Sequence, residues 1–160
     1  MPAFDSSAII HGWDNYPIAQ FPPLWDWLAA EVNAEHIKLS AVAFDEVRNV
    51  SPDCADWLKD NNLHQWPVGN RELQEALRIK TMLGIVQDQF HPNGVGENDI
   101  IIISTARLVG MDLVSNEDQP TAPQNMKKYK IPTVCRLPAV NVPCANFLEY
   151  LKQSGRVFRR

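Results

Sequence analysis

Short apolar runs that begin or end at an acidic residue alternate along this chain with segments of helical periodicity. The acids at these points are Asp5, Glu46, Asp99 and the pair Glu117 and Asp118. An alternating α/β chain forms a parallel sheet that is covered by helices on both faces. The carboxyl ends of its strands meet at one edge, where such folds bind ligands, so we expect these carboxylates to converge there. Several unpaired acids in one crevice require a cation.

The size of the chain favours one domain. The chain has 160 residues, of which 45% are hydrophobic. This length and content are enough for one core, but the chain is too short for two domains, so we interpret residues 1–160 as a single domain. No apolar stretch approaches the length of a membrane span, and the N-terminus lacks the pattern of a secretory signal. We therefore expect a cytoplasmic protein with no membrane partner.

The cysteines give no sign of a disulfide framework or a zinc site. Cys54, Cys135 and Cys144 are odd in number and show no C-x-x-C spacing. We expect buried or inert thiols.

The first half of the chain contains clear helix-start signals. Two prolines followed by apolar residues at helical spacing predict a helix near residues 22–34, and residues 37–44 are typical of a short strand. Ser51 at the N-cap and Pro52 at the first position predict a second helix. A third helical rhythm covers residues 71–86.

The four consecutive isoleucines at 100–103 are ambiguous, because β-branched residues favour strands. The flanking residues favour a helix, since Asn98 can cap it, Asp99 lies near its positive end and Gly110 can terminate it. We predict a buried helix, and if the run were a strand the crevice would lose its best-placed acid. The remaining predicted elements are a strand at 111–115, a strand near 139–142 and a helix over 143–153.

The acids predict a site for Mg²⁺ or Mn²⁺, because hard divalent cations take oxygen ligands from carboxylates, water and substrate phosphate. A pair of such ions can activate water and stabilise the leaving oxygen of an in-line displacement, so hydrolysis of a phosphodiester is the predicted reaction. Any one of these acids alone is more often a helix cap or a dipole-compensating charge. Four of them at successive strand ends favour the metal site.

Other residues near the acids are candidates for the rim of the site. Serines beside Asp5 could bind a metal-bound water or phosphate, or could simply stabilise a turn. The tryptophans at helical positions, Trp25 and Trp57, are better interpreted as core residues. The rim candidates are Ser6, Ser7, His11, Trp13, Ser115 and Asn116.

The net charge of -4 does not favour a nucleic-acid partner, because such partners usually leave a basic footprint. The distribution of charge weakens that objection, since Lys127, Lys128 and Lys130 cluster after the last acids. A phosphate-tracking rim around an acidic centre and an ordinary solvated face both fit this cluster.

Four local patterns, each containing one of the acidic positions, resemble the PIN-domain family of metal-dependent ribonucleases. That family includes the toxins of many bacterial toxin-antitoxin pairs. The patterns are Phe4–Ile10, Phe44–Val47, Glu97–Ala106 and Leu113–Asp118. Three further segments are similar to a PIN-like subgroup called DUF4411, and the likeness covers nearly the whole chain. These segments are His11–Pro17, Lys130–Cys135 and Val142–Cys144.

The resemblance implies a three-layer α/β/α sandwich with a central parallel sheet and an Mg²⁺- or Mn²⁺-dependent endoribonuclease. It further implies an RNA substrate, a cognate antitoxin protein and a homodimer. By resemblance the catalytic residues are Asp5, Glu46, Asp99 and Glu117. The family often has Asp at the last position, so Asp118 is an alternative metal ligand.

Two other functions compete with this one. A non-catalytic PIN-like module that binds RNA or a protein is the main alternative. A phosphatase of the aspartyl-phosphate type is disfavoured, because Ser7 stands where that class has its second Asp.

Overall fold

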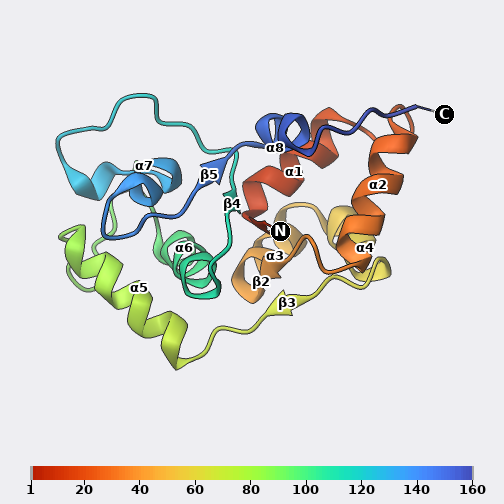
Figure 1. The fold of residues 1–160 in the computed structure, drawn as a ribbon. Helices are drawn as coiled ribbons and strands as arrows, with labels where there is room; N and C mark the ends of the chain where they lie inside the picture. Colours follow the sequence, from red (N-terminus) through yellow and green to blue (C-terminus); the bar gives the residue numbers. More distant parts are fainter. Residues whose placement is uncertain (1, 160) are drawn as a thin grey trace.

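Very short parallel strands form the centre of the fold in the computed structural model, which describes residues 2–159 (Figure 1). Three of them pair in the order β1-β4-β5, and all of these pairings are parallel. Strands β2 and β3 also pair in parallel, and a bridge between Ala3 and Lys38 joins this pair to β1. The strands are β1 Ala3–Phe4, β2 Leu39–Ser40, β3 Gln65–Trp66, β4 Leu113–Val114 and β5 Cys144–Ala145.

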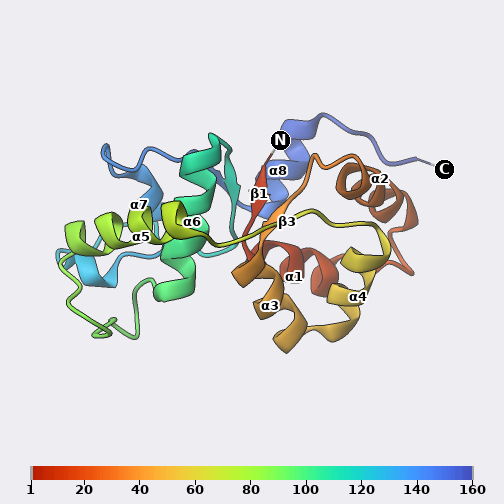
Figure 2. The same ribbon diagram turned by 90° about the horizontal axis from the view of Figure 1, so that it is seen from below.

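Helices cover both faces of these strands. Figure 2 shows α5, α6 and α7 on one side and α1, α3 and α4 on the other. The helices are α1 Ser6–Asn15, α2 Pro22–Asn33, α3 Ala41–Val50, α4 Pro52–Asp60, α5 Asn70–Met82, α6 Glu97–Val109, α7 Ile131–Arg136 and α8 Phe147–Ser154, with a 3₁₀ turn η1 at Met126–Lys128. The predicted α/β/α sandwich with a parallel sheet is confirmed. None of the helices formed by residues 2–159 is long and apolar enough to cross a membrane.

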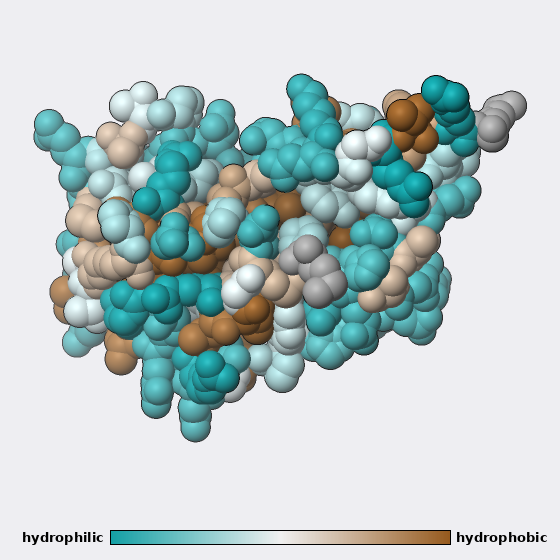
Figure 3. Space-filling model, viewed as in Figure 1, coloured by the Kyte–Doolittle hydropathy of each residue, from teal (hydrophilic) through white to brown (hydrophobic). Residues whose placement is uncertain are grey.

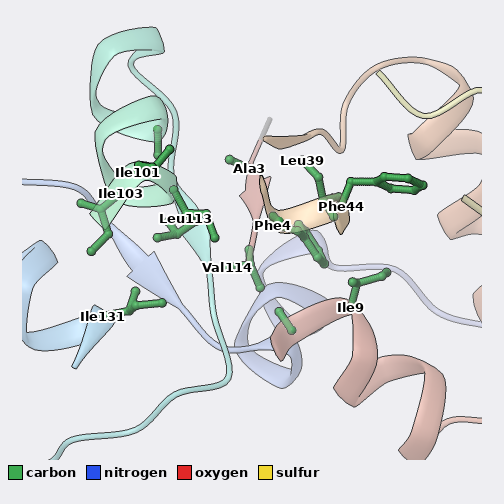
Figure 4. Close-up of a cluster of buried hydrophobic side chains, with 14 of the residues drawn as sticks. Ala3, Phe4, Ile9, Leu39, Phe44, Ile101, Ile103, Leu113, Val114 and Ile131 are labelled. Carbon is green, nitrogen blue, oxygen red and sulfur yellow. The ribbon is translucent and has the colours of Figure 1, made fainter. Parts of the chain in front are cut away.

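The core lies where the strands meet the helices (Figure 4). Phe4 of β1 and Leu113 of β4 are fully buried, as are Leu39 of β2 and Ile131 of α7. Strands that are covered on both faces have continuous apolar runs, which explains why these residues do not alternate with polar ones. The outer face shown in Figure 3 is mainly hydrophilic, with hydrophobic side chains gathered toward the middle of the view.

The isoleucine run forms the helix α6, as predicted. Ile100 to Ile103 are all buried, and the hydroxyl groups of Ser104 and Thr105 are satisfied by donating to the carbonyls of Ile100 and Ile101. Gly110 ends the helix in the left-handed conformation, with φ of 70°. The prediction that Asn98 caps the helix was wrong, because Gly96 occupies the N-cap.

The strand predicted at residues 37–44 was wrong in extent. Only Leu39–Ser40 is a strand, because the Ser40 hydroxyl accepts a hydrogen bond from the Ala43 amide at 3.2 Å and so starts α3. Helix α3 then continues to Val50. Glu46 therefore lies within a helix and not near the end of a strand.

The strand predicted near residues 139–142 was also wrong. This segment is a turn in which the amides of Val140 and Asn141 donate to the Leu137 carbonyl at 2.9 and 2.8 Å. The strand lies at Cys144–Ala145 instead. Helix α8 starts at Phe147 and not at residue 143, because Asn146 caps it by accepting the Glu149 amide at 2.8 Å.

Candidate metal centre

Asp5 is the most buried acid of the site, with 2% of its surface exposed. It follows β1 directly and occupies the N-cap position of α1. Parallel pairing of β1 with β4 brings Ser115 beside it. The hydroxyl groups of Ser7 and Ser115 both donate to Asp5 Oδ2, at 2.5 and 3.1 Å. Burial raises the pKa of Asp5, and these hydrogen bonds oppose the rise.

Glu46 reaches the same region from α3. Its Oε2 accepts a hydrogen bond from the Ser6 hydroxyl at 3.3 Å. Burial raises the pKa of Glu46 to about 7, and the negative charges of Asp5, Asp99 and Glu117 contribute to the rise. The charges of these carboxylates are therefore near enough to Glu46 to affect it.

Asp99 is held by the first turn of α6. Its Oδ2 accepts the Gly96 amide at 2.9 Å, so the side chain closes the N-terminus of the helix. Burial raises the pKa of Asp99, and the charge of Asp5 adds to that rise. Asp99 therefore stabilises the start of α6 and also lies near Asp5.

Glu117 lies beyond the end of β4. Its Oε2 accepts the amide of Ile131, the first residue of α7, at 3.0 Å. Burial, with smaller contributions from the charges of Asp99 and Asp5, raises the pKa of Glu117 to about 7, although the Ile131 amide and the charge of Lys130 oppose the rise. Asp118 is exposed, and the pKa shifts of the other acids do not include its charge among their causes. The structure thus brings Glu117, and not Asp118, to the cluster.

Two carboxylate oxygens of the cluster are buried without a hydrogen-bond partner. They are Asp5 Oδ1 and Glu46 Oε1. A buried acceptor that lacks a donor costs free energy, so each such oxygen needs an explanation. A cation between them would satisfy both, and four carboxylates are the hard oxygen donors that Mg²⁺ and Mn²⁺ prefer.

The side chains are not closed around an ion. Within residues 2–159, no three His, Cys, Asp or Glu side chains lie close enough together to hold a metal. The reason is visible in their hydrogen bonds, since Asp99 is turned toward the Gly96 amide and Glu117 toward the Ile131 amide. The donor set fits a divalent ion, and the side chains would have to rotate toward it.

Four of the six rim candidates lie at the cluster. Ser6 donates to Glu46, while Ser7 and Ser115 donate to Asp5. The backbone amide of Asn116 donates to Ser7 Oγ at 2.9 Å. The side-chain oxygen of Asn116 accepts the backbone amide of Phe147 at the same distance. The Asn116 side chain therefore connects the cluster to α8.

The other two rim candidates have aromatic neighbours. His11 and Trp13 lie on α1, and Trp13 is about 12 Å along the helix from Asp5 at 1.5 Å per residue. Trp13 packs edge-on against Trp25 and is tilted against Trp57. His11 packs near Tyr16 and bonds to Asn15. Both residues are helical, because α1 continues to Asn15.

Sequence reasoning missed the groups that hold the acids in place. The Gly96 and Ile131 amides are backbone groups that carry no residue-type signal. Gln119 was also missed, although its side chain makes two hydrogen bonds beside the cluster.

Comparisons with known proteins agree with this fold. The family model described as Domain of unknown function (DUF4411) matches residues 3–158. Among solved structures, the crystal structure of VapBC2 from Rickettsia felis bound to a DNA fragment from their promoter is similar, with a TM-score of 0.55 and 17% sequence identity. That match covers 90% of this chain and 96% of the other, and shows a shared PIN-like fold. No curated protein matches.

Proposed function

Since the chain belongs to the DUF4411 family and has a PIN-like fold, we propose that it is a metal-dependent endoribonuclease that hydrolyses RNA phosphodiester bonds. One observation carries the proposal. Four acids, from α3, from α6 and from the segments after β1 and β4, form a cluster in which the charges of Asp5 and Asp99 raise the pKa of Glu46 and Glu117. Two buried oxygens of this cluster, Asp5 Oδ1 and Glu46 Oε1, lack a hydrogen-bond partner. Such a cluster is costly unless a cation neutralises it.

Asp5, Glu46, Asp99 and Glu117 would hold Mg²⁺ or Mn²⁺. When bound, the metal supplies activation of water and neutralisation of phosphate charge. The chain's own residues fix the geometry of the acids. Ser7 and Ser115 orient Asp5 through its Oδ2, which leaves Oδ1 free. Hydrogen bonds of this kind hold ligands in the orientation that binding needs.

The biological setting follows from the same likeness. The similar solved structure is of VapBC2 bound to promoter DNA. PIN-domain toxins resemble this chain in their acidic motifs, so we propose that it is a toxin with a cognate antitoxin protein. We further propose that it acts in the cytoplasm as a homodimer.

Replacing single acids tests the nuclease proposal. Asp5→Asn and Asp99→Asn each remove a charge from the cluster while keeping the size of the side chain. Each substitution should remove several kcal/mol of metal-dependent stabilisation of the transition state. The rate of RNA cleavage should therefore fall at least about 100-fold, as measured with Mg²⁺ or Mn²⁺ on a labelled RNA.

Asp45→Asn is the matched control, because Asp45 is exposed on α3 next to Glu46 and pairs with Arg48. It should cleave like the wild type. Equal cleavage by the Asp5 or Asp99 variants, or cleavage in the presence of a chelator, would contradict the proposal.

The open arrangement of the acids favours one alternative, a non-catalytic PIN-like module that binds RNA or a protein. Such a module would not cleave RNA at any metal concentration. Its binding would survive the Asp5 and Asp99 substitutions.

A further inference from the structure

A basic segment lies against the acidic cluster. We call Lys128, Lys130 and Arg136 the basic strip; all three are exposed. Figure 1 shows the long connection from β4 that runs out from the sheet and returns to α7, where the strip lies. Lys127 is not included, because it is only half-exposed and its Cε is 3.9 Å from the position of a Cβ on Gly84.

The backbone of the strip is docked on the segment that leads into α6. The Val95 amide donates to the Tyr129 carbonyl at 2.8 Å. Gly94 approaches so closely that a Cβ there would lie 1.9 Å from the Lys127 carbonyl oxygen. Since Asp99 lies only a few residues further on, this contact fixes the strip relative to that acid.

Gln119 fixes the strip relative to Glu117. Its side-chain amide donates to the Lys128 carbonyl at 3.0 Å, and its side-chain oxygen accepts the Lys130 amide at 2.8 Å. Its own carbonyl accepts from Arg136 Nη2 at 3.0 Å. Gln119 lies two positions after Glu117 and thus contacts every member of the strip.

The basic side chains of the strip lie close to the acids but remain available to a ligand. Lys130 directly precedes Ile131, whose amide donates to Glu117 Oε2 at 3.0 Å, so the strip lies beside that carboxylate. Within residues 2–159, none of the ion pairs closer than 4.0 Å includes a residue of the strip. An ordinary solvated face would not require its backbone to be held at both ends.

Cations held beside a metal-binding cluster suit a polyanion whose phosphates pass from one to the other. We propose that the basic strip binds the RNA backbone next to the bond that is cut, and that Gln119 is the positioning residue that keeps the strip beside Glu117. The inference rests on the proposed nuclease function for its choice of RNA.

The test measures RNA binding without cleavage. In the full-length Asp5→Asn protein, the double variant Lys128→Ala, Lys130→Ala should bind a single-stranded RNA oligonucleotide more weakly by about tenfold at low salt. The slope of log K against log salt should fall in magnitude by about 1.4, for two lost phosphate contacts.

A second double variant controls for the loss of charge itself. Arg71→Ala, Lys152→Ala removes the same charge from exposed positions on α5 and α8. Its RNA affinity and salt slope should remain close to those of the parent. Equal losses in both double variants, or in neither, would overturn the proposal.

Gln119→Ala tests positioning, because it changes no charge. In the otherwise wild-type protein it should raise KM for RNA several-fold while kcat and the melting temperature stay nearly constant. An unchanged KM would overturn the role of Gln119.

If the wild-type protein does not cleave RNA but RNA binding still depends on the strip, the role of the strip is supported and only the nuclease proposal fails.

Discussion

At the scale of single residues, Glu46 and Glu117 carry the clearest physical signature. In the folded protein both have a pKa of about 7, against an ordinary value of 4.5. Between about pH 4.5 and pH 7, these two carboxyl groups therefore bind protons more tightly in the folded state than in the unfolded state. Without metal, their effect is absent below about pH 4.5 and reduces the free energy of unfolding increasingly up to about pH 7, above which it is complete.

Glu46→Gln should therefore stabilise the metal-free protein at alkaline pH. We expect its melting temperature at pH 8 to exceed that of the wild type by a few degrees, and the difference to shrink at pH 5. Because Glu46 is only partly buried, solvent screening keeps the gain modest. Thermal unfolding in the presence of chelator measures it.

Added Mn²⁺ should reverse the order of the two proteins at pH 8, because the ion binds the folded wild type more tightly. Asp56→Asn, an exposed position on α4, is the control and should show neither effect. A melting temperature of Glu46→Gln at or below that of the wild type in chelator at pH 8 would refute the electrostatic interpretation.

The residue types at the site could be read from the sequence more readily than their hydrogen bonds. Asp5 and Asp99 lie beside apolar runs in the chain, and both lie in the cluster. Glu46 was expected there on the assumption of a long strand, yet it arrives from the middle of α3. The Ile131 amide that holds Glu117 could not be predicted, because its position depends on how α7 packs.

At the scale of elements, long helices were more predictable than strands. The strand predicted at residues 111–115 contains β4, whereas the strands predicted at residues 37–44 and 139–142 were wrong in extent or position. Helix α6 could be identified because Asp99 and Gly110 mark its ends, despite the strand propensity of the isoleucines between them. A strand of two residues has no periodicity to detect. Ser40 ends β2 and caps α3 at once, so the apolar run that continues past it suggested a longer strand.

Gly94→Ala tests the contact between two elements. The new methyl group would overlap the Lys127 carbonyl oxygen, which is backbone and cannot move aside cheaply. We expect a loss of about 1–3 kcal/mol or more in the free energy of unfolding. Denaturant unfolding monitored by circular dichroism measures this loss.

Gly110→Ala is the comparison, because it has open space around the Cβ but a φ of +70°. Its cost should be about 1 kcal/mol, from backbone strain alone. If Gly94→Ala is less costly than Gly110→Ala, the strip is not docked as tightly as described.

At the scale of the whole molecule, the site is shared among both helical layers and the sheet. Asp5 follows a strand, Glu46 and Asp99 come from helices on opposite faces, and Glu117 lies in the connection to α7. The alternation of elements predicted this layered fold. It could not predict Gln119, whose hydrogen bonds appear only after the connection folds back.

The proposed role as a toxin is tested with the whole cell as the readout. Induced expression of the wild type should arrest bacterial growth, whereas Asp99→Asn should not, because RNA cleavage would be lost. Colony counts after induction measure the difference. Arrest that persists in the Asp99 variant at equal protein levels would argue against a nuclease toxin.

The length of the strands has a consequence for how copies of this chain meet. The outer strands β3 and β5 have two residues each, so they present few unpaired amides and carbonyls to another chain. A longer edge would be a template for adding a further strand, which is a common start of aggregation. The same shortness means that the sheet cannot persist once the helices separate, so loss of the layers and loss of the strands should occur together.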